Sequence, residues 1–194
     1  MKIFPIDNKK FMRLLDIMPP LSITDGPWIA GGAVRKIYQN KSWETGDIDI
    51  FFKNEEQRKY WNANLAGTLC ANNINYNLKH QSSNADTWEM YFKDRNLKIQ
   101  FIKKYYCQSL TELWNNFDFT VCQFAADSAN IIASDAAIND SSINQIVIAN
   151  KNNIDCIPLR ILKYLSHGFS ISDEILLLAA EKIKTGEVDW ENEY

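Results

Sequence analysis

The chain has 194 residues, of which 46% are hydrophobic and 23% are charged, with a formal net charge of −3. This composition excludes an intrinsically disordered chain, because unfolded segments combine few apolar residues with a high net charge. The slight excess of acidic residues also argues against a protein that holds nucleic acid by bulk positive charge. The length fits one domain, or one domain with a small appendage.

Cysteine spacing and the apolar runs together favour a cytoplasmic protein. No CxxC pair occurs, so neither a structural zinc site nor a disulfide framework is expected. Residues 1–7 lack the apolar core of a signal peptide, and no apolar run reaches the roughly 18 residues of a membrane span. We therefore expect no membrane contact, and the sequence does not indicate an oligomeric state. The widely spaced cysteines are Cys70, Cys107, Cys122 and Cys156.

The first part of the chain predicts helices and strands in alternation. Residues 8–18 place apolar side chains at helical spacing, and two prolines then end the helix. A short apolar run at 27–30 leads into a glycine pair, after which residues 33–40 have a helical pattern. Residues 46–53 alternate acidic and apolar residues, which is typical of a strand. The next predicted elements are a helix at 54–69, strands around 74–79, 87–92 and 97–103, and a short helix near 108–115.

The pattern changes toward the C-terminus. Residues 117–126 are densely apolar, and two segments with helical periodicity follow from Pro158 onward. Ser172 is the expected N-cap of the second helix and Gly186 its expected end. The acidic tail after Gly186 is expected to fray. The outline is an α+β core over residues 1–154 with a small helical extension over residues 155–194.

The most informative residues for chemistry are Asp47 and Asp49. They stand two apart in a predicted strand, so both side chains leave the same face of the sheet. Two carboxylates on one face repel each other unless a cation lies between them, and Mg²⁺ prefers oxygen ligands that include substrate phosphates. A lone DxD pattern is also common in surface turns, so this pair needs support from other residues.

That support comes from Gly31 and Gly32, which follow an apolar stretch and open a helix. Backbone N–H groups without side chains in front of them allow a phosphate to approach closely. Arg35, one helical turn further, is placed to reach the same anion. Glycine pairs alone are mostly turns. A glycine elbow, an arginine and a DxD strand in this order predict a site for a metal-bound triphosphate.

The stretch IAGGAVRKIYQNKSWETGDIDIFF, which contains these residues, resembles the signature of the polymerase-β-type nucleotidyltransferase superfamily. It is most similar to the head and neck of class II tRNA CCA-adding enzymes and poly(A) polymerases. FDFTVCQFA at 117–125 resembles the family segment that lies near the ribose. PLRILK at 158–163 resembles the neck segment in which the base is chosen. The resemblance implies a nucleotidyltransferase-type mixed sheet flanked by helices, with residues 155–194 as a neck-like extension.

The resemblance also implies a set of site residues. Gly31, Gly32 and Arg35 would hold the triphosphate, while Asp47 and Asp49 would bind two Mg²⁺ ions, or Mn²⁺ in their place. One ion would activate a hydroxyl nucleophile and the other would neutralise the pyrophosphate leaving group. By the same resemblance, Asp118 would contact the sugar of the incoming nucleotide, and Arg160 would contact its base.

The chain departs from the family pattern at positions that choose substrate. Lys36 replaces the acid of the VRD motif, and Asn116-Phe117 replaces a pair of arginines before Asp118. Cys156 and Ile157 stand where the neck of the family carries Glu-Asp. Without that acid, the usual reading of C and A edges by an Asp/Arg pair cannot operate.

A third carboxylate is common on a later strand of the superfamily. The matching strand at 97–102 places Gln100 at the candidate position. An amide is a poorer metal ligand than a carboxylate, although it can bond to a sugar hydroxyl or a phosphate. Asp118 and Glu89 are alternative third acids, and Glu89 is more readily interpreted as an outward strand residue.

Two hypotheses follow from these residues. The first is a metal-dependent nucleotidyltransferase that moves a nucleoside monophosphate from a nucleoside triphosphate such as ATP to a hydroxyl acceptor. The acceptor would be an RNA 3′ end such as that of tRNA, which would make the protein an RNA-processing enzyme, or else a protein or a small molecule. The second is a catalytically degenerate fold that binds nucleotide or RNA. A basic groove at the site would favour an RNA acceptor, and an apolar one would favour a protein or small molecule.

Overall fold

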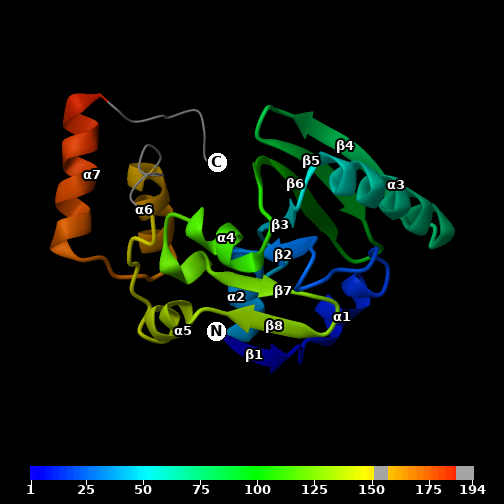
Figure 1. The fold of residues 1–194 in the computed structure, drawn as a ribbon, viewed down its shortest axis with the longest axis horizontal. Coiled ribbons are helices and arrows are strands. Elements are labelled where there is room, and N and C mark those ends of the chain that lie inside the picture. Colours follow the sequence, from blue (N-terminus) through cyan, green and yellow to red (C-terminus); the bar gives the residue numbers. More distant parts are fainter. Residues whose placement is uncertain (151–156, 187–194) are drawn as a thin grey trace.

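The computed structural model describes residues 1–150 and 157–186, which form a mixed eight-stranded sheet with helices on both faces (Figure 1). The strand order is β1-β8-β7-β2-β3-β6-β5-β4. The β3–β6 pair is parallel and every other neighbouring pair is antiparallel. The strands are β1 (Lys2–Pro5), β2 (Trp28–Ala30), β3 (Asp47–Phe52), β4 (Asn75–Gln81), β5 (Ala85–Tyr91), β6 (Asn96–Tyr106), β7 (Phe124–Ala126) and β8 (Asn130–Ala133).

The helices divide between the two faces of this sheet. Apolar side chains of α1, α2 and α3 pack with Ile48, Ile50 and Phe52 of β3 in the largest core cluster. Helix α4 packs on the opposite face with Trp28 and Phe51. The sheet is therefore buried on both sides near β2 and β3. The helices are α1 (Lys9–Leu15), α2 (Gly32–Tyr38), α3 (Glu55–Ala71), α4 (Leu110–Asn115), the 3₁₀ turn η1 (Thr120–Cys122), α5 (Asp135–Ser142), α6 (Ile157–Ser166) and α7 (Asp173–Thr185).

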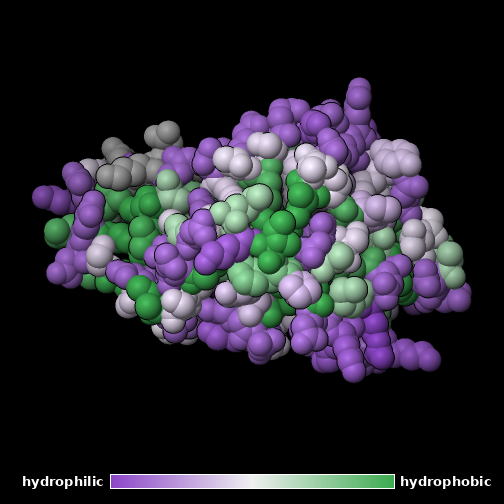
Figure 2. All heavy atoms as spheres, turned by 60° about the horizontal axis from the view of Figure 1, so that its bottom comes forward, coloured by the Kyte–Doolittle hydropathy of each residue, from purple (hydrophilic) through white to green (hydrophobic). Residues whose placement is uncertain are grey.

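The C-terminal helices α6 and α7 lie at one end of the molecule (Figure 1, left). They share a separate apolar cluster with η1, in which Phe119 and Val121 pack with Tyr164 and Phe169. The same end carries exposed apolar side chains, seen as green atoms at the left of Figure 2. The predicted boundary between residues 154 and 155 lies outside the described residues, so the two-part division stays a prediction. The exposed large side chains of α6 and α7 are Leu162, Leu165, Leu176, Leu177 and Ile183.

The α+β fold class and its main elements are confirmed. The predicted strand at 46–53 is β3, and the predicted helix at 54–69 is α3, which runs two residues further to Ala71. Ser172 caps α7 through a hydrogen bond from the N–H of Ile175, and Gly186 ends the helix in a left-handed conformation. The fraying predicted for residues 187–194 lies outside the described part of the chain.

Three elements are missing from the sequence prediction. Strands β1 and β8 pair with each other at the sheet edge, and each has only four residues, too few to show a period. Helix α5 follows them, and its N-cap Ser134 was a readable signal. The first helix also ends earlier than predicted, at Leu15. Within the described residues, no helix is both long enough and apolar enough to cross a membrane.

Candidate active site

Asp47 and Asp49 lie on the face of β3 opposite the main core. Ile48 and Ile50 alternate with them and are fully buried against the helices of the other face, which fixes the strand. In the parallel β3–β6 pair, Gln100 is the register partner of Asp49. The side chains of paired residues leave the sheet on the same face. The sequence prediction that Gln100 stands at the third-ligand position is therefore consistent with the register.

The environment of Asp49 is unfavourable for a lone carboxylate. Its Oδ1 atom is buried and has no hydrogen-bond partner, and the Oε1 atom of Gln100 is in the same condition. Burial, with the nearby charge of Asp47, raises the pKa of Asp49 from 3.8 to about 7. These two oxygen atoms are hydrogen-bond acceptors without donors, and a cation bound between them would offset the cost of their burial.

The glycine elbow lies beside these carboxylates. Gly31 has a φ of 89°, a conformation open to glycine, and a Cβ there would lie 3.7 Å from Oδ2 of Asp49. The N–H of Gly31 donates to the carbonyl of Phe124, 2.8 Å away, so it is not available to a phosphate. This corrects the expectation that both glycines present their N–H groups. The first turn of α2, which begins at Gly32, has no side-chain cap and is the part that can receive an anion.

The two glycines give a matched pair of variants. Gly31→Ala is expected to destabilise the fold by about 1–2 kcal/mol, because its positive φ strains any residue with a Cβ. Gly32→Ala is expected to leave stability almost unchanged, because nothing lies within 4 Å of its added Cβ. If a phosphate approaches this elbow, Gly32→Ala will still raise the KM for nucleotide. Thermal unfolding and nucleotide titration of both variants separate these effects, and an unchanged KM in Gly32→Ala would argue against the elbow.

Arg35 is placed differently from the sequence expectation. Its guanidinium stacks on the rings of Tyr164 and Phe169, at 5.0 and 4.6 Å from their centroids. The residue is only 3% exposed, and its Nε and Nη1 atoms have no hydrogen-bond partner. Arg35 therefore joins α2 to the C-terminal helices, and its contact with a triphosphate stays a prediction.

Asp118 and Arg160, expected at the sugar and the base, contact each other. Both guanidinium nitrogens Nε and Nη2 of Arg160 donate to the carboxylate of Asp118, and the Nη2–Oδ1 distance is 3.1 Å. Burial alone would lower the pKa of Arg160, but Asp118 raises it well above its ordinary value, so the guanidinium stays charged. Their separate roles toward sugar and base stay predictions.

The sequence did not single out two further partners of this ion pair. Cys122 accepts from Nη2 of Arg160 at 3.6 Å, and its sulfur lies 2.9 Å from the hydroxyl of Tyr164. Cys122 belongs to a densely apolar segment and Tyr164 to an amphipathic helix, so both resemble ordinary core residues. Only their position in the fold shows that they surround a buried charge.

The alternative third acids do not join Asp47 and Asp49. Glu89 lies on β5, beyond β6, where it forms an ion pair with Lys79 at 2.8 Å and accepts from Tyr91 at 2.6 Å. Asp118 is occupied by Arg160. Among the residues that the structure describes, no group of three or more His, Cys, Asp and Glu side chains could hold a metal ion. A metal here would take two carboxylates from the protein and its other ligands from elsewhere.

Comparison with known protein families identifies the chain at the family level. A model of the family described as Gabija anti-defense 2 matches residues 6–164. The chain belongs to this family. The protein named Gabija anti-defense 2 of Bacillus phage SPbetaL7 is 30% identical over 104 residues, which are 51% of this chain and 22% of the phage protein. The chain thus matches less than a quarter of that curated relative.

Solved structures with the same fold are CCA-adding enzymes. The Thermotoga maritima enzyme complexed with tRNA has a TM-score of 0.60 and 16% identity, covering 96% of this chain and 47% of that enzyme. A CCA-adding enzyme in complex with ATP has a TM-score of 0.63 and 16% identity, and the match covers 96% of this chain and 48% of that enzyme. The predicted nucleotidyltransferase fold is confirmed. This chain spans about half the length of those enzymes.

Proposed function

We propose that this Gabija anti-defense 2 family member transfers a nucleoside monophosphate from a nucleoside triphosphate to a hydroxyl acceptor. The observation that carries the proposal is the buried Oδ1 of Asp49, which has no hydrogen-bond partner and lies beside Asp47 and the elbow at Gly31. Both carboxylates and the elbow meet on one face of β3, as the sequence predicts for a metal-bound triphosphate.

The residues present fit a magnesium–nucleotide complex. Mg²⁺ is commonly held by one or two carboxylates and completes its octahedral shell with waters and substrate phosphates. Asp47 and Asp49 provide the carboxylates, and the side-chain oxygen of Gln100 is an additional neutral acceptor without a partner. When bound, divalent ions supply the positive charge that activates the attacking hydroxyl and offsets the charge on the leaving pyrophosphate.

The protein residues position the reactants. The hydroxyl oxygen of the acceptor forms a bond to the α-phosphorus and releases its proton to solvent. The bond from that phosphorus to the bridging oxygen breaks, and pyrophosphate leaves with the electron pair. The first turn of α2 has no side-chain cap and would face the phosphates, and the open space at Gly32 would leave them room to approach. The Asp118–Arg160 pair fixes α6 against the core, so the neck-like helix is held near Asp49.

We further propose that this chemistry serves to counter bacterial defence. The support is the family itself, since the family model and the matched phage protein are both described as Gabija anti-defense 2. The acceptor in that role stays open among RNA, a protein and a small molecule.

A binding module without chemistry is the second candidate. Gln100 favours it, because the strand position that faces Asp49 carries an amide in place of an acid. The cost of keeping the carboxylates of Asp47 and Asp49 close together opposes it, since binding alone does not require two acids on one face of a strand.

The test is transfer of an α-phosphate label. Purified protein is incubated with Mg²⁺ and each α-labelled nucleoside triphosphate, with total RNA, tRNA or total protein as acceptor. The proposal predicts label in one acceptor pool with wild type and none with an Asp47→Asn/Asp49→Asn variant. Nucleotide binding without label in any pool, including lysate small molecules, supports the binding module instead.

A further inference from the structure

Basic side chains from two elements gather next to the carboxylates. The Nζ of Lys36, on α2, lies 3.6 Å from the position of a Cβ on Gly46, the residue directly before Asp47. Lys163 and His167 come from α6 and the turn after it, four residues apart. Burial lowers the pKa of Lys36, and the positive charges of Arg35 and Lys163 lower it further. The pKa of His167 is lowered by burial and by the charges of Lys36, Arg35 and Lys163. The positive charges of these side chains therefore repel one another.

In the described part of the chain, no carboxylate forms an ion pair with Arg35, Lys36, Lys163 or His167. Arg35 is buried, with two guanidinium nitrogens lacking any hydrogen-bond partner. Like charges held together and a buried unpaired guanidinium are both costly unless an anion joins them. The arrangement is that of an anion site.

We infer that Lys36 and Lys163, beside the buried Arg35, bind the terminal phosphates of the incoming triphosphate, the portion released as pyrophosphate. The inference rests on the proposed function and extends it to residues that stand outside the predicted site. Lys36 is the position at which this chain exchanges the acid of the related motif for a base.

The position of Lys36 beside the carboxylates favours the phosphates of the nucleoside triphosphate as the bound anion, and not the backbone phosphates of a nucleic-acid acceptor. The Nζ of Lys36 lies 3.6 Å from the position that a Cβ on Gly46 would take, directly before Asp47. Lys163 precedes Tyr164, on whose ring Arg35, the neighbour of Lys36, stacks at 5.0 Å. A phosphate held by the carboxylate-bound metal is therefore within reach of both lysines. Long flexible lysine side chains bind phosphate as point charges.

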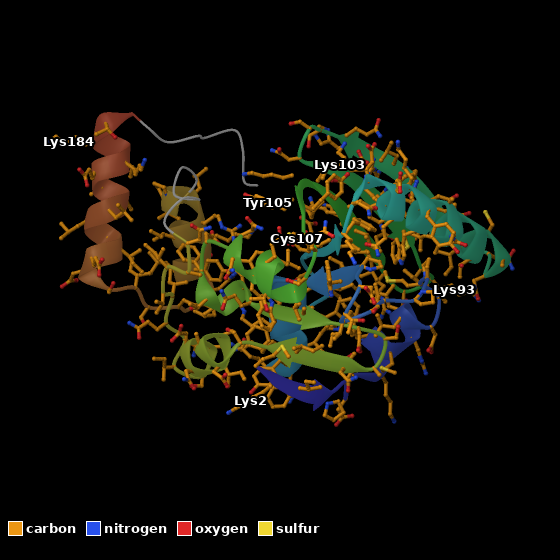
Figure 3. The ribbon with its side chains drawn as sticks, in the orientation of Figure 1. Lys2, Lys93, Lys103, Tyr105, Cys107 and Lys184 are labelled. Atoms are coloured by element: carbon orange, nitrogen blue, oxygen red, sulfur yellow. The ribbon has the colours of Figure 1, made fainter. Side chains whose placement is uncertain are left out.

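Calorimetric titration with sodium pyrophosphate, in EDTA and without acceptor, tests the anion site independently of catalysis. Lys36→Gln and Lys163→Gln are each expected to weaken pyrophosphate binding by about tenfold, the loss typical of one charge-assisted contact. Lys93→Gln and Lys184→Gln are matched controls with the same charge change at opposite ends of the molecule, and should bind as wild type (Figure 3). Circular dichroism establishes that each variant is folded.

A parallel titration with a single-stranded oligonucleotide distinguishes the two sources of phosphate. Weaker pyrophosphate binding with unchanged oligonucleotide binding supports the inference. Weaker oligonucleotide binding alone, equal loss in the control variants, or no pyrophosphate binding by wild type overturns it. If pyrophosphate binding depends on Lys36 but no label is transferred in the acceptor assay, the anion site stands and the enzymatic proposal fails.

The two histidines supply a second readout, since the chain contains only His80 and His167. Pyrophosphate bound among the cations should raise the pKa of His167, followed by NMR, and should leave the ring resonances of His80 on β4 unshifted. A His167 titration that does not respond to saturating pyrophosphate would contradict the assigned position.

Discussion

Asn in place of Asp49 is expected to reduce nucleotidyl transfer by at least about a thousandfold and, at the same time, to stabilise the metal-free protein. Burial and Asp47 raise the pKa of Asp49 to about 7 in the folded state, from 3.8. Between about pH 4 and pH 7 this carboxyl is protonated in the folded protein but ionised in the unfolded chain. The free energy of unfolding therefore falls as the pH rises through this range. Above pH 7 the whole penalty is present.

The size of this effect is measurable by unfolding in EDTA. At pH 8 Asp49→Asn should be more stable than wild type by about 2–4 kcal/mol, and at pH 4 the two should be nearly equal. Asp94→Asn, at an exposed acid in the turn between β5 and β6, is the matched control and should change neither activity nor stability. A variant that is inactive but less stable at pH 8 would point to a structural role for Asp49.

Removal of Asp118 is expected to cause the largest loss of stability. Asp118→Ala leaves the guanidinium of Arg160, whose side chain is only 16% exposed, without its bidentate partner, and breaking one side of such a pair costs about 3–5 kcal/mol. Because the pair joins α6 to the core, the loss should appear in urea unfolding monitored by tryptophan fluorescence. The C-terminal helices should also become more susceptible to limited proteolysis.

The double variant Asp118→Ala/Arg160→Met is the control for this interpretation. Met retains most of the hydrocarbon of Arg160 and removes the unpaired charge, so the double variant should be clearly more stable than Asp118→Ala. If the two substitutions instead add, the ion pair is not the source of the loss. Asp118 would then act mainly through its hydrogen bond to the N–H of Phe119.

The sequence was sufficient for the parts of the fold that have strong local signals. The alternation of Asp47 and Asp49 with buried isoleucines gave β3 and the orientation of both acids. Helix α3 and the caps of α7 followed from periodicity and cap chemistry. The edge strand β1 is too short to show a period, and its pairing partners on β8 are 125 or more residues away in the sequence. Strand β8, between β1 and β7, is equally short.

For the candidate site, local residues were predictable and their partners were not. The position of Gln100 followed from matching the strand at 97–102 to the family pattern, while its register with Asp49 is a finding of the structure. The stacking of Arg35 on Tyr164 and Phe169 depends on how α6 docks, which no local pattern encodes. The same docking pairs Asp118 with Arg160 and brings Lys36 near Lys163. Long-range packing therefore decides which predicted ligands remain open to substrate.

Electron paramagnetic resonance of Mn²⁺ tests the central claim most directly, because it requires no knowledge of the acceptor. Mn²⁺ is titrated into the protein with a non-hydrolysable nucleoside triphosphate, and the free-ion signal reports binding. We predict that wild type removes Mn²⁺ from solution in a nucleotide-dependent manner and that Asp47→Asn/Asp49→Asn does not. Equal binding by the double variant, beyond that of nucleotide alone, would contradict the assignment of these two carboxylates as the metal site.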